Sequence, residues 1–337
     1  MSNQTLSRRS LFKTTFAASL AMVGSSVLHP LYASEDMAFK GPDVPDVDAV
    51  KVGSRCYYLP ASEPMPSKEN LGFFSNPSFI VTSEGVVVVD TGSSVQIGEM
   101  LLRQIKKITD KPVAMVINTH FHGDHWLGNH AFVQDNPNVK IYAHEKTISA
   151  LKGGADKFWL DFMQLETQNQ ITGTVATLPN ATLNGGEKIE VGDTTIKIHH
   201  FGKMHSDADI AIEIVEDKTM IMGDMVMRRI ANMADGSYLG TIKGLDQILK
   251  MPIDTFIPMH GKHEGKKLLE DTRQFMDIVY NDSGRYYDED GLSDFEIKPK
   301  IMAHPFMKSE VSKWPGYESG IGRFIVVAIK EFEENMF

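Results

Sequence analysis

Residues 113–129 read Val-Ala-Met-Val-Ile-Asn-Thr-His-Phe-His-Gly-Asp-His-Trp-Leu-Gly-Asn and join an apolar run directly to a cluster of titratable side chains. Three imidazoles and one carboxylate lie within the six positions from His120 to His125. The apolar residues 113–117 predict a buried strand, so the cluster begins where a strand ends, which is where α/β folds place ligand groups. Polar groups this crowded repel one another or compete for water unless a cation lies between them. We therefore interpret the cluster as a metal site.

The same arrangement recurs elsewhere in the chain, because an Asp or His follows shortly after each of four other apolar runs that predict strands. These residues are Asp90, His205, Asp224 and His260. The run before Asp90 consists of four valines, residues 86–89, and predicts a strand buried on both faces. If loops from several strands meet at one edge of a sheet, they gather these side chains into one site.

Imidazole and carboxylate ligands suit zinc, and also iron or manganese. Positions i and i+2 of an extended loop share a face, so His120 and His122 can bind one ion together. Asp224 has two carboxylate oxygens and can bridge two ions. The seven expected ligands form a first group, a second group and a bridge: His120, His122 and His205; Asp124, His125 and His260; and Asp224.

Two ions ~3.5–4 Å apart can hold a hydroxide between them and lower its pKa toward neutrality. That hydroxide can attack a carbonyl or a similar centre. Asp124 is placed to orient the hydroxide or to take its proton. Asp90 is expected to support the ligand loop rather than to bind an ion.

Residues 119–125 match the His-x-His-x-Asp-His signature of the metallo-β-lactamase superfamily, and the chain resembles that family over residues 52–266. Asp90, His205, Asp224 and His260 match its other motifs in the family's order. The resemblance implies an α/β fold, the αββα sandwich of two mixed β-sheets flanked by helices, with a two-metal site at the edge of the sheets.

Within this superfamily the chain looks less like a true β-lactamase than like the glyoxalase II and other metallohydrolase branches. Many zinc β-lactamases have a cysteine at the position of Asp224, and a lysine shortly after it holds the drug carboxylate. Here only Arg228 or Arg229 could take the place of that lysine. The leader and the C-terminal tail resemble exported members linked to sulfur oxidation or quinoprotein systems.

The leading hypothesis is an exported hydrolase with two metal ions, zinc before iron or manganese, that cleaves an ester, thioester or lactam-type bond of a small molecule. The alternative is a mononuclear iron persulfide dioxygenase of the same fold, whose iron would use the positions of His120, His205 and Asp224. A binding protein without activity is a third reading, and the complete ligand set argues against it.

Composition narrows the choice of partners. The chain has 337 residues, 23% charged residues and a net charge of −10. It has no dense basic block in its body, which argues against nucleic acid or an anionic membrane as the main partner. The single cysteine, Cys56, excludes an intramolecular disulfide.

The first 33 residues have the layout of an export signal, with a basic start, an apolar run and a small-residue cleavage site after Ala33. The paired Arg8 and Arg9, followed by Leu-Phe-Lys, resemble a twin-arginine signal. The apolar run is too weakly hydrophobic to predict a permanent membrane span. We therefore expect a periplasmic or otherwise exported protein with no stable span once the signal is removed.

The mature chain divides into an expected metallo-β-lactamase-like domain, residues 34–285, and a C-terminal extension, residues 286–337, that ends in a helix over 322–334. Residues 281–294 are expected to form a linker, and 295–300 an extended segment. The loop 60–77 is long enough to have a function, and its Phe73 and Phe74 either cap a pocket or pack on the core. Trp314 and Tyr317 are further candidates to reach the site.

Overall fold

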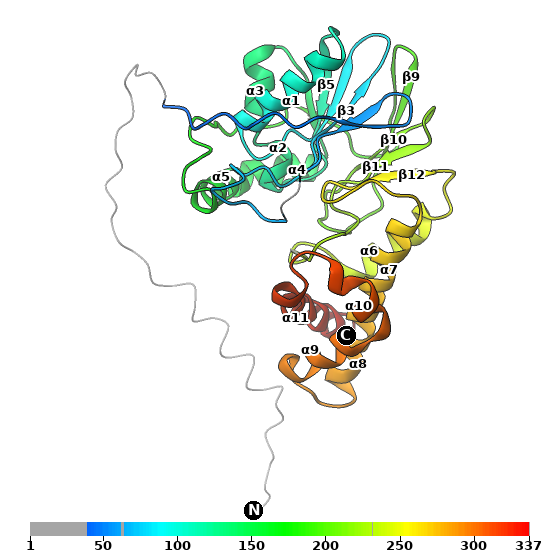
Figure 1. The fold of residues 1–337 in the computed structure, drawn as a ribbon. Helices are drawn as coiled ribbons and strands as arrows, with labels where there is room; N and C mark the ends of the chain where they lie inside the picture. The colour runs from blue at the N-terminus through cyan, green and yellow to red at the C-terminus, as the bar shows by residue number, and fades with distance from the viewer. Residues whose placement is uncertain (1–38, 62–63, 231, 337) are drawn as a thin grey trace, which may run out of the picture. The chain divides into compact units, whose positions relative to one another are not determined.

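Two β-sheets lie face to face in the computed structural model, which describes residues 39–61, 64–230 and 232–336 (Figure 1). The first sheet has the order β1-β2-β3-β4-β5-β6-β7, antiparallel from β1 to β4 and parallel from β4 to β7. Its strands are β1 (Val50–Val52), β2 (Cys56–Tyr58), β3 (Ser78–Val81), β4 (Val86–Val89), β5 (Val113–Ile117), β6 (Ile141–Ala143) and β7 (Ala181–Thr182).

The second sheet has the order β12-β11-β10-β9-β8 and is antiparallel except where β11 pairs with β12. Its strands are β8 (Lys188–Val191), β9 (Thr194–His199), β10 (Ala211–Ile214), β11 (Thr219–Ile221) and β12 (Thr255–Ile257). Both sheets are therefore mixed, as predicted.

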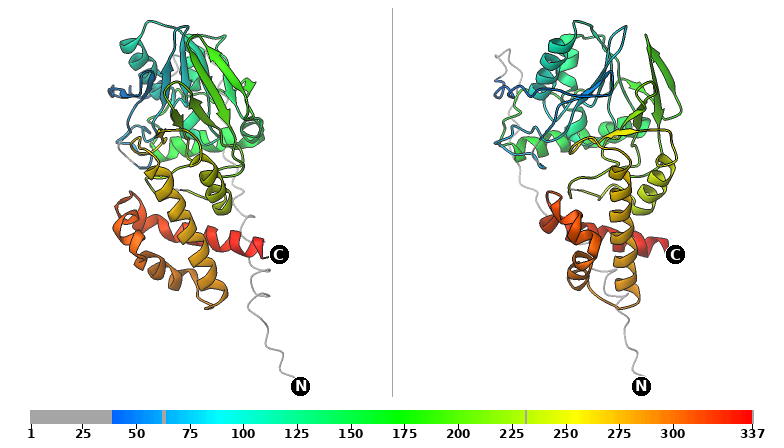
Figure 2. Two further views of the ribbon diagram at one scale, coloured as in Figure 1. Left: turned by 90° about the vertical axis from the view of Figure 1, so that its right-hand side faces the viewer. Right: turned by 45° about the vertical axis from the view of Figure 1, so that its right-hand side comes forward.

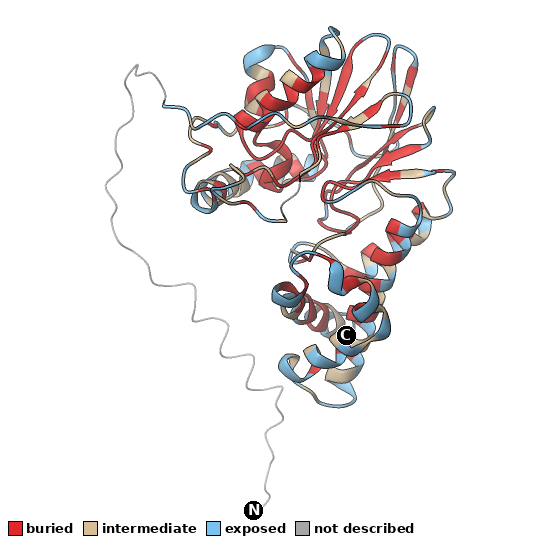
Figure 3. Ribbon diagram, in the orientation of Figure 1, coloured by how far each residue is buried: buried red, intermediate tan, exposed pale blue. Residues whose placement is uncertain are grey.

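The inner core forms where the two sheets meet, and Figure 3 shows that most residues of the central strands are buried. Val87 and Val89 of β4 pack inward against isoleucines of the second sheet. Val86 and Val88 point to the other face and pack under the helices α1 (Val95–Ile108) and α3 (Asn129–Asp135). All four valines are inaccessible to solvent, which confirms the prediction of a strand buried on both faces.

Helices cover the outer faces of both sheets, which completes the predicted αββα sandwich. On the second sheet, α6 (Tyr238–Ile248) and the start of α7 (Lys267–Asp277) pack against β10, β11 and β12. Near the ligand loops lie the short helices α2 (Gly123–Trp126) and α4 (Glu145–Ala150), a π-helical turn η3 (Leu151–Ala155) and α5 (Asp156–Glu166).

The remaining helices form a separate hydrophobic cluster at one end of the sandwich (Figure 2). It contains the end of α7 and the helices η4 (Ile278–Asp282), α8 (Ser283–Asp288), α9 (Asp294–Ala303), α10 (Pro305–Ser309), η5 (Val311–Lys313) and α11 (Tyr317–Asn335). Residues from the loop between β11 and α6 share this cluster. No helix in the described part of the chain has the length and apolarity that a bilayer span requires.

Two expectations for the C-terminal region are wrong. The segment 281–294 is helical as far as Asp288, because the helix continues from α7 and packs Tyr286 and Tyr287 against the helical cluster. Residues 295–300 belong to α9, which begins with a capping box between Ser293 and Glu296. The terminal helix is confirmed and starts earlier than predicted, at Tyr317.

Further elements that the sequence did not predict include the strands β1, β7 and β8 and the helices α2, α3, α6 and α10. The signal expected over 1–33 lies outside the described residues, and the domain boundary at 285 stays a prediction.

Candidate metal centre

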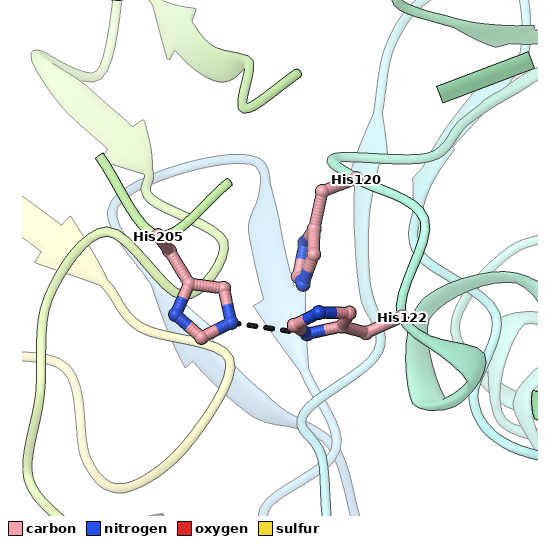
Figure 4. Close-up of side chains that lie close together, drawn as sticks. All are labelled: His120, His122 and His205. Carbon is pink, nitrogen blue, oxygen red and sulfur yellow. Dashed lines mark hydrogen bonds between the residues drawn. The ribbon is translucent and has the colours of Figure 1, made fainter. Parts of the chain in front are cut away.

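Three imidazoles from two loops converge at the edge of the sandwich (Figure 4). His120 and His122 follow β5, whereas His205 lies in the loop between β9 and β10. His205 Nε2 lies 3.1 Å from His122 Nδ1, and the ring centre of His120 lies 4.6 Å from that of His122 and 5.0 Å from that of His205. The structure therefore brings together the first predicted ligand group, with one donor atom of each ring within 4.8 Å of the others.

The second predicted group lies beside the first. Asp124 and His125 are on α2, and His260 follows β12. Asp124 Oδ2 lies 3.2 Å from His260 Nε2 and 3.4 Å from His125 Nε2. All three side chains are buried, and their donor atoms are close enough together to hold one ion.

Asp224 lies between the two groups, where the sequence predicts a bridge. Its Oδ2 lies 3.6 Å from His205 Nε2 and 3.3 Å from His260 Nε2. Its Oδ1 lies 3.6 Å from His125 Nε2. One carboxylate thus faces both ligand groups.

Several donor atoms of the cluster are buried without a hydrogen-bond partner. They are His120 Nε2, Asp124 Oδ2, His125 Nε2, His205 Nδ1 and Asp224 Oδ1. Folded proteins rarely leave buried polar atoms unsatisfied. Unpaired nitrogen and oxygen donors of this kind suit zinc, iron or manganese, so the residues present fit a pair of metal ions.

The charges of the cluster also suit cation binding. Burial, with a smaller effect of neighbouring imidazoles, lowers the pKa of His120 well below its ordinary value, and burial lowers the pKa of His205 to about 3. Both rings are therefore neutral near pH 7 and offer lone pairs.

The opposite shifts occur in the second group. Burial lowers the pKa of His125, but Asp124, Asp90 and Asp224 outweigh it and raise that pKa well above its ordinary value. Burial raises the pKa of Asp124, but His125 and His260 outweigh it and hold that pKa well below its ordinary value. Metal-free protein thus holds a proton at His125 where a metal ion would place positive charge.

Asp90 supports the ligand loop, as predicted. It has a left-handed backbone, with φ of 57°, directly after β4. Its buried carboxylate accepts hydrogen bonds from the Thr119 backbone N–H (2.7 Å) and from Thr119 Oγ1 (2.8 Å), and it lies 2.8 Å from His125 Nδ1. These contacts turn His125 Nε2 toward the cluster.

Two similar supports were not predicted. The backbone carbonyl of Phe74 lies 2.8 Å from His260 Nδ1. Asp235 Oδ2 lies 3.0 Å from His122 Nε2, which directs His122 Nδ1 toward His205. Asp235 is 113 residues from His122 in the chain, and no local pattern marks it in the sequence.

A cavity of about 370 Å³ opens onto the ligands. The loop 60–77 contributes Met65, Pro66 and Phe74, and α5 contributes Trp159, Phe162 and Met163. Phe73 instead packs against the outer core under α1, so only the second of the two adjacent phenylalanines borders the site. Most of the lining away from the ligands is apolar.

The two consecutive arginines after Asp224 have different surroundings. Arg228 forms ion pairs with Glu264 and Asp271 and lies over the Trp314 ring. Arg229 lines the cavity instead. Its Nη2 lies 2.6 Å from His260 Nε2 and 3.8 Å from Asp224 Oδ2.

Trp314 and Tyr317 belong to the helical cluster and are not part of the cavity lining. From the C-terminal helices, Arg323 of α11 reaches the cavity, and the sequence did not single it out. The other described histidines bond to groups outside the cluster: His130, His144, His199, His200, His263 and His304.

Comparison with known proteins agrees with this geometry. The family model described as the metallo-beta-lactamase superfamily matches residues 71–260. A linear primary-alkylsulfatase of Pseudomonas sp. (strain ATCC 19151) is 23% identical over 282 residues, covering 68% of this chain and 50% of that protein. The chain therefore spans about half the length of this relative. A metallo-beta-lactamase type 2 of Bacillus sp. (strain 170) is 24% identical over 211 residues, covering 59% of this chain and 74% of that protein.

Solved structures agree on the fold. A metallo-beta-lactamase from Pontibacter korlensis has a TM-score of 0.55 at 20% identity and covers 68% of this chain and 99% of its own. The DIM-1 metallo-beta-lactamase has a TM-score of 0.54 at 19% identity, with 70% and 99% covered. Because the family model covers more than half of the chain, including five of the seven strands of the first sheet and all seven expected ligands, this protein belongs to the metallo-beta-lactamase superfamily.

Proposed function

We propose that this protein is a metal-dependent hydrolase that holds two metal ions, most suitably zinc, and cleaves an ester, thioester or lactam-type bond of a small molecule. The observation that carries the proposal is the convergence of seven donor side chains, five of which have a buried nitrogen or oxygen atom without a hydrogen-bond partner among the described residues. Two divalent ions, when bound, supply a hydroxide at neutral pH and stabilise the negative charge that develops on the attacked group.

The chain's own residues have distinct parts in this proposal. His120, His122 and His205 hold the first ion; Asp124, His125 and His260 hold the second; and Asp224 faces both. The low pKa of Asp124 keeps its carboxylate charged, so that it accepts a hydrogen bond from the attacking water and orients it. Arg229 places a cation beside His260 and Asp224, where it can neutralise negative charge on the substrate.

The named activities of the two relatives, a linear primary-alkylsulfatase and a metallo-beta-lactamase, support hydrolysis as the reaction class. The apolar lining of the cavity supports an organic substrate with an apolar part. The alternative, a mononuclear iron persulfide dioxygenase, leaves Asp124 and His125 without an ion, and their buried unpaired donor atoms argue against it.

Metal analysis of the purified protein separates these two functions. We expect close to two zinc ions per chain and turnover of at least one member of a panel of esters, thioesters, sulfate esters, lactones and β-lactams. One iron per chain, with oxygen consumption on a persulfide, would refute the hydrolase and support the dioxygenase.

Replacement of Asp124 with Asn tests the role of its carboxylate. We expect turnover to fall about 100-fold or more, in the range usual for loss of an acid–base group. Asp161→Asn is a matched control, because Asp161 is an exposed carboxylate on α5 that forms an ion pair with Lys157 and does not line the cavity. Equal turnover of the Asp124 variant and the wild type would refute the role.

We also propose that the protein is exported, on the basis of the signal-like residues 1–33, which lie outside the described residues. Changing both Arg8 and Arg9 to Lys should retain the full-length precursor inside the cell if a twin-arginine pathway carries it. Cell fractionation measures where the double variant accumulates. Export equal to that of the wild type would contradict the twin-arginine route.

A further inference from the structure

We propose that the substrate is amphiphilic, with an apolar segment and an anionic group at the end away from the cleaved bond, and that Arg323 binds this anionic group. The inference rests on the proposed hydrolytic function and names the substrate class for the same site. Arg323 lies outside the family-matched residues 71–260, so it is a feature of this chain's C-terminal helices.

Arg323 is an available cation at the cavity. It lines the same cavity as His122, His205 and Asp224. Within residues 39–61, 64–230 and 232–336, no hydrogen bond or ion pair occupies its guanidinium, and the side chain is exposed to solvent. Arginine has five N–H donors in a planar arrangement that matches a carboxylate, sulfate or phosphate group. An unpaired arginine facing a substrate cavity is therefore suited to an anion.

The position of Arg323 is set by contacts of its helix with the sandwich. The hydroxyl of the buried Tyr238 donates a hydrogen bond to the Phe324 carbonyl at 2.7 Å. Glu331, further along α11, accepts hydrogen bonds from Ser237 Oγ at 2.7 Å and from the Tyr238 backbone N–H at 2.6 Å. The loop that begins α6 thus fixes α11 beside the cavity, and the arginine is presented by a rigid element.

Away from the proposed ligands, most of the lining contributed by the sandwich is apolar. Phe74, Trp159, Phe162 and Met163 form part of this wall, and Met65 adds to it. Such a surface favours an aliphatic or aromatic segment, because each buried methylene group is worth about 0.8 kcal/mol. A substrate with its reactive bond at the metal ligands and its anion at Arg323 would place its apolar segment against this wall.

The charges around the cavity favour an anion over a cation. Glu166 of α5 also lines the cavity without a partner among the described residues, and it lies beyond ion-pair distance of Arg323. Arg229 is the third charged residue of the lining that is not a proposed ligand, and it faces Asp224. Apart from the proposed ligands, the lining therefore contains two positively charged side chains and one negatively charged side chain, in a chain whose net charge is −10. A local excess of positive charge on an acidic protein attracts and selects anionic ligands.

A pair of esters of equal chain length tests the inference: 4-nitrophenyl hydrogen adipate, which is anionic, and 4-nitrophenyl hexanoate, which is neutral. For Arg323→Gln we expect KM of the anionic ester to rise about tenfold, as for loss of one charge-assisted contact. KM of the neutral ester and kcat for both esters should stay close to the wild-type values. Lys330→Gln is the matched control, because Lys330 is an exposed cation on α11 that pairs with Glu334 and does not line the cavity.

A binding measurement separates failure of this inference from failure of the proposed function. Adipate monoamide and hexanamide serve as uncleaved probes, and the signal is the intrinsic tryptophan fluorescence, to which Trp159 in the cavity wall contributes. Weaker binding of adipate monoamide to Arg323→Gln, with no hydrolysis of either ester, would support the anion subsite and contradict ester hydrolysis. If both esters are hydrolysed and the KM of the anionic ester is the same for Arg323→Gln and the wild type, the anion subsite is refuted and the hydrolase function is retained. Preference for a cationic ester, lost in Glu166→Gln, would also overturn it.

Discussion

Replacing Asp90 with Asn should weaken the second metal site without removing any expected ligand. Asp90 lies 2.8 Å from His125 Nδ1 and accepts two hydrogen bonds from Thr119. An Asn side chain keeps one acceptor oxygen, which the Thr119 backbone N–H can still use. Its NH₂ group then faces His125 Nδ1, and two donors cannot bond to each other.

The mismatch forces His125 into the tautomer that carries its proton on Nε2. That nitrogen is the atom that faces Asp124 and Asp224, so its lone pair is no longer available to an ion. Loss of such an orienting group typically costs about 10- to 100-fold in metal affinity, which corresponds to about 1.4 to 2.7 kcal/mol.

The assay is a competition titration against a chromophoric chelator, which resolves the affinity of each metal equivalent. We expect the loss to be confined to the ion held by Asp124, His125 and His260. Asp217→Asn is the control, because Asp217 also has a largely buried carboxylate that accepts backbone hydrogen bonds from Ser54 and Arg55. Equal affinities in wild type and the Asp90 variant, or an equal loss in the control, would refute the reasoning.

Three further predictions test other contacts of the site. Asp235→Asn should weaken binding of the ion held by the first group by about tenfold, because Asp235 orients His122. Chelator competition measures this affinity. A loss confined to the ion held by the second group would contradict the prediction. Metal binding should release a proton from His125, whose pKa is raised in the metal-free protein, so apparent affinity should rise with pH below that pKa. Calorimetry in buffers of different ionisation enthalpy measures the number of protons released. Metal binding without proton release between pH 6 and 7 would contradict the prediction. Glu331→Gln should lower the free energy of unfolding by about 1 to 2 kcal/mol, since its carboxylate caps the start of α6 at Tyr238, and urea unfolding that matches wild type would refute this.

The seven expected ligands were predictable because their signals are local. His120, His122, Asp124 and His125 are adjacent in the chain, and the apolar run before them marks the end of a strand. In this fold, the loops that follow several strands meet at one edge of the sandwich, so side chains with the same local context come together. The sandwich itself was predictable from the family signature and from the alternation of apolar runs with helical patterns.

The C-terminal helices were harder to predict because tertiary contacts outweigh local composition there. The segment 281–288 is rich in polar residues, yet its Tyr286 and Tyr287 pack against the helical cluster and keep it helical. The strand β7 has only two residues, and two of the four residues of β8 are polar and exposed, so neither carries an apolar run to recognise, and pairing with their neighbours defines them.

The sequence by itself determined which residues offer donor atoms and how they divide into two groups and a bridge. Only the tertiary structure decided what surrounds them: Asp235 behind His122, Arg229 beside His260, and Arg323 at the cavity. The physical reason is that ligand identity depends on the chemistry of each side chain and its neighbours along the chain. The orientation of the ligands, the lining of the cavity and its balance of charges depend instead on contacts between segments far apart in the sequence. A single polar residue in a loop or on a helix does not reveal such contacts.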